Sequence, residues 1–299
     1  MVRTVVAGID GSAESRAAAE WAAREAGLRG LPLRLVHAWE PVPLAQAPLL
    51  GAETRQHWTE RIPRETAQGL TLRHPGVEIT HVHVAGRPAD VLVDAADGAG
   101  LLVLGSRALS GAGGFLAGSV GQAVVARTRT PVVLVRAGEQ AADEHVMDPV
   151  GIPSAATAFR PVVLGLDTDG PDAAVIVFAF EEAALRATAL HVVHGWNPPP
   201  YYVHAVAAGV DPHDGIAPEQ AAALAEVLRP WRRKYPDVEV AEDSRTGSPA
   251  ARLVDAAREA SLVVVGRRIR RSPFGVHIGP VTHAVLHHAA APVAVVAHG

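Results

Sequence analysis

The sequence predicts an α/β chain of two homologous, Rossmann-like domains, each a doubly wound parallel sheet of five strands in the order 3-2-1-4-5. Short apolar runs without polar alternation, as at residues 101–104, are typical of parallel strands covered on both faces. These runs alternate with segments of helical periodicity, which favours right-handed βαβ units. The same succession of patterns occurs twice along the 299 residues.

The first half contains nine predicted elements. Strands are expected at 2–10, 33–39, 77–84, 101–105 and 132–136, and helices at about 12–29, 53–72, 88–97 and 119–129. Ser12 and Ser15 are candidate caps of the first helix, and Pro88 suits the first turn of the third. Pro63 is expected to kink or divide the second helix.

The second half repeats the first. Residues 5–10 match 162–167 with an offset of 157, and residues 86–96 match 247–257 with an offset of 161. The segment between the halves is polar and contains proline, which is typical of a linker. We therefore expect domains at 1–137 and 160–299 with a linker at 138–159.

Composition restricts the partners. The chain has no cysteine, which favours a reducing cytoplasm, and no apolar run of about 18 residues that would span a membrane. A net charge of −4 argues against sequence-independent nucleic-acid binding, which needs a strong basic face. Small molecules and proteins remain as expected partners.

A glycine-rich stretch follows the fourth predicted strand. Gly105 is expected to end that strand, and Gly111, Gly113 and Gly114 allow the backbone to approach a ligand closely. A helix is expected to begin near Ser119, so its free N–H groups would face the stretch and favour a phosphate. An ordinary structural turn is the alternative, because neither common phosphate-binding glycine motif is present.

Asp10 follows the first strand. In the expected strand order, the first and fourth strands flank the switch point where doubly wound sheets bind ligands. Asp10 would then accept hydrogen bonds from a base, a ribose or backbone N–H groups, and the alternative is that it only fixes the following turn.

These motifs together resemble the universal stress protein family, in two tandem copies. The resemblance rests on residues 5–12 (VVAGIDGS), 36–39 (VHAW) and 86–96 (GRPADVLVDAA), and on the signature G-2x-G-9x-G-[ST] of the ATP-binding branch. Gly105, Ala108 and Gly118-Ser119 reproduce that signature except at its second glycine. In the second half, Ile269 and Pro280 depart from it further.

The resemblance implies a nucleotide site in the first half. By this resemblance, the adenine and ribose would be bordered by Ile9, Asp10, Val36 and His37. The phosphates would be held by Gly105, Arg107, Ala108, Gly118, Ser119 and Val120. The matching second-half positions are Asp167, Val193, Gly266 and Gly279. Because Pro280 has no N–H, we expect the second half to bind nucleotide weakly or differently.

The expected function is that of an ATP-binding stress-response module whose nucleotide regulates contacts with a protein partner. ATP is the implied cofactor, with Mg²⁺ as an optional companion. No catalytic residue is identified, so any hydrolysis would be slow. Two alternatives stay open: a nucleotide-free dimerisation scaffold, and an ATP-using enzyme of the adenine-nucleotide hydrolase superfamily.

Two further expectations concern metals and self-association. No metal site is expected, because His81 with His83 lacks a third ligand and the neighbours His287 and His288 point to different sides of a helix. The closing strands at 131–135 and 292–296 are apolar and lie at a sheet edge in the expected order. We expect the two halves to pair through them, with further homodimerisation open.

Overall fold

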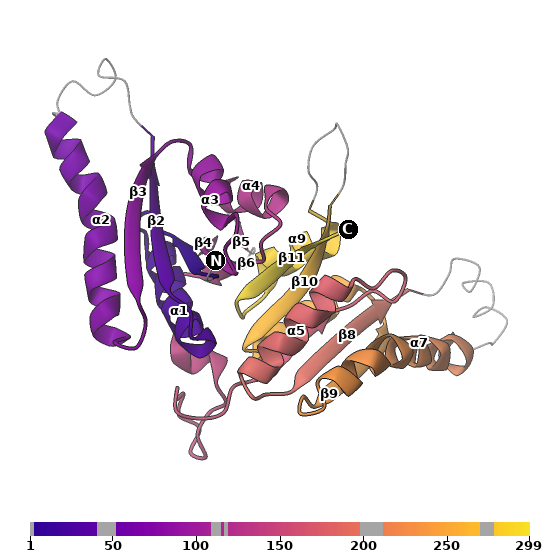
Figure 1. Ribbon diagram of the computed structural model, residues 1–299. Coiled ribbons are helices and arrows are strands. Elements are labelled where there is room, and N and C mark those ends of the chain that lie inside the picture. The colour runs from indigo at the N-terminus through magenta and orange to yellow at the C-terminus, as the bar shows by residue number, and fades with distance from the viewer. Residues whose placement is uncertain (1–2, 41–51, 109–114, 117–118, 198–211, 270–277) are drawn as a thin grey trace. The chain divides into compact units, whose positions relative to one another are not determined.

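The computed structural model describes residues 3–40, 52–108, 115–116, 119–197, 212–269 and 278–299 (Figure 1). The described residues up to Ala141 form one compact unit, and those from Ala142 form a second. No helix in these ranges has an apolar stretch long enough to cross a bilayer.

Unit 1 is a doubly wound parallel sheet. Its strands are β1 (Val5–Gly8), β2 (Leu33–Trp39), β3 (Ile79–Ala85), β4 (Leu101–Ala108) and β6 (Val132–Arg136). Its helices are α1 (Ala13–Arg29), α2 (Ala52–Arg73), α3 (Pro88–Ala96) and α4 (Ser119–Arg127). The strand order β3-β2-β1-β4-β6 confirms the predicted order 3-2-1-4-5.

The crossovers place the helices of unit 1 in two layers. Helices α1 and α2 pack together on one face of the sheet, and α3 and α4 pack together on the other. Apolar strand residues between the layers are fully buried, as Leu33, Leu101 and Val133 are. This burial on both faces explains why the strands lack polar alternation.

Unit 2 repeats this arrangement. Its elements are β7 (Val162–Gly165), α5 (Ala173–Leu185), β8 (Leu190–Trp196), α7 (Pro212–Lys234), β9 (Val240–Thr246), α8 (Pro249–Ala256), β10 (Leu262–Arg268), α9 (Pro280–His288) and β11 (Val293–His298). The order β9-β8-β7-β10-β11 is that of unit 1, and all neighbours are parallel.

The fourth strand of unit 1 corrects the prediction that Gly105 ends it. β4 continues to Ala108, because Gly105 and Ser106 still pair with β6. Arg107 and Ala108 then pair in antiparallel register with β5 (Phe115–Leu116). The glycine-rich stretch therefore begins as the stem of a hairpin, and Ala108 has the extended backbone of a strand, which alanine adopts without strain.

Two other predicted features have a definite local structure. α2 is one helix from Ala52 to Arg73 with Pro63 inside it, so the proline does not divide it. The predicted linker contains a 3₁₀ turn at Ala141–Glu144 and an antiparallel bridge between His145 and Phe159. The Val146 N–H donates to the carbonyl of Ala158 over 2.9 Å, which closes the intervening segment into a loop.

The first helix begins one turn later in unit 2 than in unit 1. In α1, Ser12 is the N-cap and accepts a hydrogen bond from the Ser15 N–H over 3.1 Å. The residue that matches Ala13 is Gly170, whose φ of +124° is not helical. α5 starts instead at Ala173, capped by the Asp172 carboxylate.

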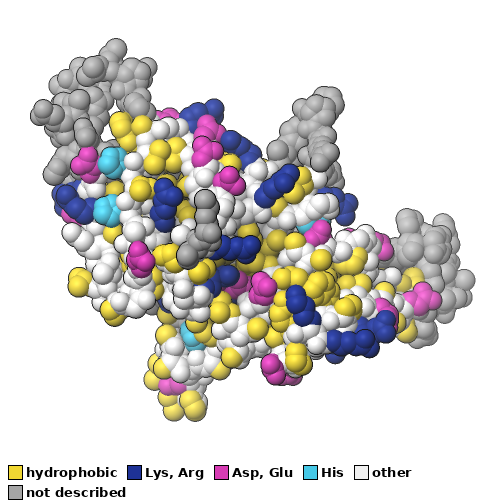
Figure 2. All heavy atoms as spheres, in the orientation of Figure 1, with side chains coloured by type: hydrophobic (Ala, Val, Ile, Leu, Met, Phe, Trp, Pro, Cys, Tyr) yellow, Lys and Arg dark blue, Asp and Glu magenta, His cyan; other side chains and the backbone are white. Residues whose placement is uncertain are grey.

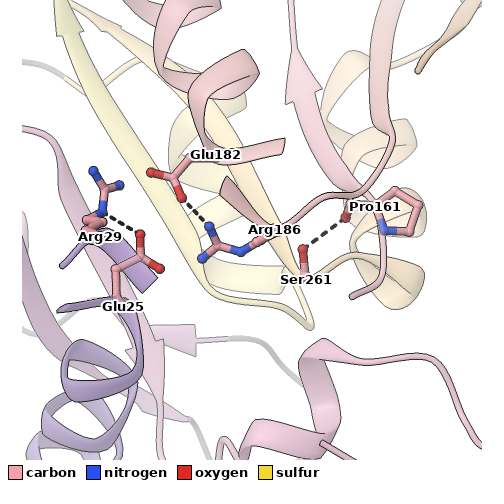
Figure 3. Close-up of polar contacts among 6 residues, drawn as sticks. All are labelled: Glu25, Arg29, Pro161, Glu182, Arg186 and Ser261. Carbon is pink, nitrogen blue, oxygen red and sulfur yellow. Dashed lines mark hydrogen bonds and ion pairs between the residues drawn. The ribbon is translucent and has the colours of Figure 1, made fainter. Parts of the chain in front are cut away.

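A buried ion pair occurs at matching positions near the ends of these two helices (Figure 3). In α1, Arg29 Nε donates to Glu25 over 2.6 Å, and the Glu25 side chain is 1% exposed. At the end of α5, the C-cap residue Arg186 pairs with Glu182, and both side chains are almost fully buried. The offset of 157 applies to both members, so the pair is part of the repeat.

Acidic and basic side chains are intermingled on the face of the molecule that Figure 2 shows. They do not gather there into the single basic field that binds nucleic acid without sequence preference.

Candidate functional site

A cavity of about 200 Å³ lies in unit 1 where β1 ends, between β1, β2 and β4. It is lined by Gly8, Ile9, Asp10, Ser12, Glu14, Ser15, Ala38, Pro88, Leu92, Leu104, Gly105, Val120 and Gly121. β1 and β4 are the strands that flank the switch point of the sheet. The cavity therefore occupies the position where doubly wound sheets bind their ligands.

Three helices begin at this cavity. Ser12, Glu14 and Ser15 line it from the first turn of α1, Pro88 from that of α3, and Val120 from that of α4. Helix N-termini carry free N–H groups and a partial positive charge. The described residues that line the cavity include no lysine or arginine, so what they offer an anion is chiefly backbone N–H groups.

Gly105 permits close packing between α1 and β4. A Cβ at this position would lie 2.5 Å from the carbonyl carbon of Glu14 and 2.7 Å from its oxygen. No side chain fits at these distances, so any larger residue would displace the first turn of α1 from the cavity wall. The glycine thus determines the shape of the site through packing.

The Asp10 carboxylate fixes the turn that leads into α1. Its Oδ1 accepts a hydrogen bond from the Ser12 N–H over 3.0 Å, and Asp167 accepts one from the Asp169 N–H over the same distance in unit 2. Asp10 also lines the cavity and is exposed. The turn interaction and a position beside a ligand are therefore compatible.

Val36 and His37 border the cavity residues but do not line the cavity themselves: the Ile9 N–H donates to the Val36 carbonyl over 2.9 Å. Val36 is buried in the sheet. Ala38 lines the cavity, and His37, its neighbour in β2, lies on the opposite face of that strand. His37 Nδ1 is buried and has no hydrogen-bond partner among the described residues. Burial lowers the pKa of His37 and nearby His83 lowers it further, whereas the negative charge of Asp10 opposes the shift.

The structure thus brings together part of the predicted site. Ile9, Asp10, Gly105 and Val120 line the cavity, whereas Val36 and His37 do not. Gly118 lies outside the described residues, and only the backbone is described at Arg107, Ala108 and Ser119. The same cavity contains residues that sequence reasoning did not assign to a ligand, among them Glu14, Ala38, Leu92 and Gly121.

A sequence signal for some of the missed residues did exist. Ser12, Ser15 and Pro88 are recognisable as helix starts, and in this fold these starts lie at the carboxyl edge of the strands. Placing each predicted helix start at that edge would have added them to the site.

The corresponding region of unit 2 is built differently. A Cβ at Gly195, the counterpart of Ala38, would lie 2.6 Å from Cα of Pro249, because α8 packs directly against β8. A Cβ at Gly266 would lie 2.9 Å from Nε2 of His298, whose ring takes the side on which the Glu14 backbone lies in unit 1. The Thr282 hydroxyl donates to the Gly266 carbonyl over 2.8 Å.

The other predicted residues of unit 2 are partly engaged as well. Asp167 fixes its turn, Val193 is buried, and Gly279 is the N-cap position of α9 without a side-chain cap. The His194 ring, which matches His37, lies 3.0 Å from the carbonyl of Leu166 and 3.0 Å from Oε1 of Gln220 on α7. Burial lowers the pKa of Arg267, which follows Gly266.

Comparison with known proteins gives one family. A sequence model of the universal stress protein family matches residues 1–136 and 158–297. A universal stress protein of Mycobacterium tuberculosis (strain H37Rv) is 32% identical, with 97% of this chain and 96% of the relative covered. One of Mycolicibacterium smegmatis is 31% identical, with coverage of 98% and 96%.

A crystal structure shows the same fold. The structure of a universal stress protein from Archaeoglobus fulgidus superimposes with a TM-score of 0.70 at 17% identity. It covers 99% of this chain and 98% of its own.

Proposed function

Because this chain belongs to the universal stress protein family, we propose that its first half binds an adenine nucleotide, ATP foremost, as a regulatory module of the stress response. The observation that carries the proposal is the meeting of three helix N-termini at one cavity beside Asp10. Such N-termini suit the phosphates, and an exposed carboxylate suits hydroxyl or amine donors of the nucleoside.

The size of the cavity limits what it encloses. Pockets that bury a drug-sized ligand have volumes of roughly 300–1,000 Å³. A cavity of about 200 Å³ holds only part of ATP, so the rest of the nucleotide extends beyond the lining residues. Asp10 and Glu14 supply carboxylate oxygens for Mg²⁺ if the ion accompanies the phosphates.

The proposed role is binding, with slow hydrolysis at most. Among the described lining residues, the carboxylates of Asp10 and Glu14 are the candidate bases, and Asp10 already accepts a hydrogen bond from the Ser12 N–H. The consequence of binding would then be conformational, because a bound nucleotide stabilises the arrangement of α1, α3 and α4 around it.

A pair of matched variants tests the site. Val120→Glu adds a negative charge at the first turn of α4, where it repels phosphate but is favourable for the helix itself. Val281→Glu makes the same change at the matching, equally half-buried position of α9. We expect ATP affinity, measured by calorimetry on the full chain, to fall about tenfold or more in the first variant only.

The results separate the candidate functions. Equal weakening by both variants would contradict a first-half site, and the absence of binding at millimolar ATP would favour a nucleotide-free scaffold. Nucleotide released by denaturing freshly purified protein gives an independent count, expected at one per chain. Substrate-dependent release of pyrophosphate would instead indicate an ATP-using enzyme.

Self-association through the closing strands β6 and β11 stays a prediction of the sequence. Sedimentation velocity over a range of concentrations measures whether the full chain forms dimers. A protein partner also stays a prediction, to be sought by comparing proteins captured with and without ATP.

A further inference from the structure

Helix α9 carries two histidines whose rings meet on one face. His283 and His287 are four residues apart, and their Nε2 atoms are 3.1 Å from each other. His283 is exposed, whereas the His287 side chain is largely buried. The expectation of no metal site rests on other histidine pairs and leaves this spacing unconsidered.

The distance between the two nitrogens is that of two ligands on one metal ion. Imidazole nitrogens bind late first-row metals at about 2.0–2.1 Å. With the two nitrogens 3.1 Å apart, the N–metal–N angle would be about 100°. That angle lies between the right angle of a square-planar or octahedral site and that of a tetrahedron. The spacing i, i+4 is also the one by which a helix offers two histidines to zinc.

Metal binding requires a lone pair on each Nε2 atom of the pair. A neutral imidazole keeps a lone pair for a metal, whereas an imidazolium has none. In the metal-free contact one Nε2 donates to the other, and a shift of that proton to Nδ1 frees both nitrogens without net proton release.

We propose that His283 and His287 form a two-histidine site for a divalent late first-row metal ion, with Cu²⁺ bound most tightly. Imidazole ligands suit Cu²⁺, Ni²⁺ and Zn²⁺, and Cu²⁺ leads this series in affinity. Among the described residues, no third His, Cys, Asp or Glu side chain lies close enough to complete a three-ligand metal site. Water therefore fills the remaining positions on the exposed side of His283, and the site clamps one turn of α9.

The experiment uses untagged full-length protein with Cu²⁺ as the only added metal. Equilibrium dialysis counts the bound copper, and electron paramagnetic resonance reports its nitrogen ligands. His283→Gln removes an exposed ligand and is expected to fold normally. His288→Gln is the matched control, because it removes an adjacent exposed histidine that is not part of the pair.

We expect His283→Gln to bind one copper fewer per chain, or to bind that copper with an affinity more than about tenfold lower. His288→Gln should bind copper as the wild type does. His287→Gln should match His283→Gln if it folds, and the proposal stands on His283→Gln alone if it does not. A wild-type chain that binds no copper, or equal copper in the wild type and His283→Gln, would overturn the proposal.

Discussion

His37 and His194 occupy the same place in the repeat but have different surroundings. The His194 ring lies within hydrogen-bond distance of the Leu166 carbonyl and the Gln220 side chain. His37 Nδ1, by contrast, is buried with no partner among the described residues. Burial of an imidazole disfavours its protonated form, which agrees with the lowered pKa of His37.

The lowered pKa of His37 predicts that unit 1 loses stability at acidic pH. The ordinary histidine pKa is 6.5, and the folded value of His37 is lower, so below about pH 6.5 the unfolded chain binds a proton that the folded chain does not. The free energy of unfolding therefore decreases as the pH falls through this range, by at most about 1.4 kcal/mol per pH unit for one histidine.

We expect His37→Gln to reduce this loss. Urea unfolding of both proteins at pH 8.0 and pH 5.5 measures it, with the difference at pH 8.0 giving the packing cost of the substitution. An equal loss of stability in the variant and the wild type would show that His37 does not contribute. EDTA in all samples keeps metal binding at other histidines out of the comparison.

At the level of helices and strands, most of the fold follows from hydrophobic periodicity. α1, β2 and α3 lie within a few residues of their predicted bounds, because burial on one stripe or on both faces leaves a strong pattern. β5 escaped prediction, since two residues are too few for periodicity and their pairing with Arg107 and Ala108 is a tertiary contact. The later start of α5 depends on the positive φ of Gly170, which the alignment of the repeats does not reveal.

The cavity was less predictable than the fold. Ile9 and Asp10 could be placed because a residue after a central strand lies at the ligand edge of the sheet. Ala38 could not be distinguished from His37, because that requires knowing which face of β2 each side chain occupies. The role of Gly105 depends on the Glu14 backbone, 91 positions away in the sequence.

The repeated ion pair gives a prediction about α5. Arg186 and Glu182 have side chains that are 0% and 1% exposed, so removing the arginine leaves a buried carboxylate without its intrahelical cation. We expect Arg186→Met to lower the free energy of unfolding by about 3–5 kcal/mol, measured by urea titration. Arg29→Met should cost less, because the Arg29 side chain is 19% exposed and water replaces part of the interaction.

The double variant Glu182→Met/Arg186→Met tests the cause. Replacing both charges by apolar side chains also removes the buried carboxylate that has lost Arg186, so most of the lost stability should return. A double variant as unstable as Arg186→Met would show that packing of the arginine stem, and not its charge, is what matters.

Over the whole chain, the two halves share a topology, but the described residues at the carboxyl ends of their central strands differ. Unit 1 has the cavity at which α1, α3 and α4 begin. In unit 2, Pro249 packs against Gly195, His298 lies beside Gly266, and α5 begins one turn later. The two halves thus share the strand order and the buried ion pair, whereas the described residues at the carboxyl ends of the strands differ.

This asymmetry predicts where ATP protects the backbone. A ligand that binds one half adds its binding free energy to the local opening reactions of that half, so hydrogen exchange slows there. With saturating ATP, we expect protection in peptides that cover residues 8–15, 104–106 and 119–122, and none in the matching peptides at 165–172, 265–267 and 280–283. Val120→Glu supplies the control, because it should lose the protection without altering exchange in the ATP-free protein. Equal protection of both halves would contradict the asymmetry, whereas absence of protection in both would contradict nucleotide binding itself.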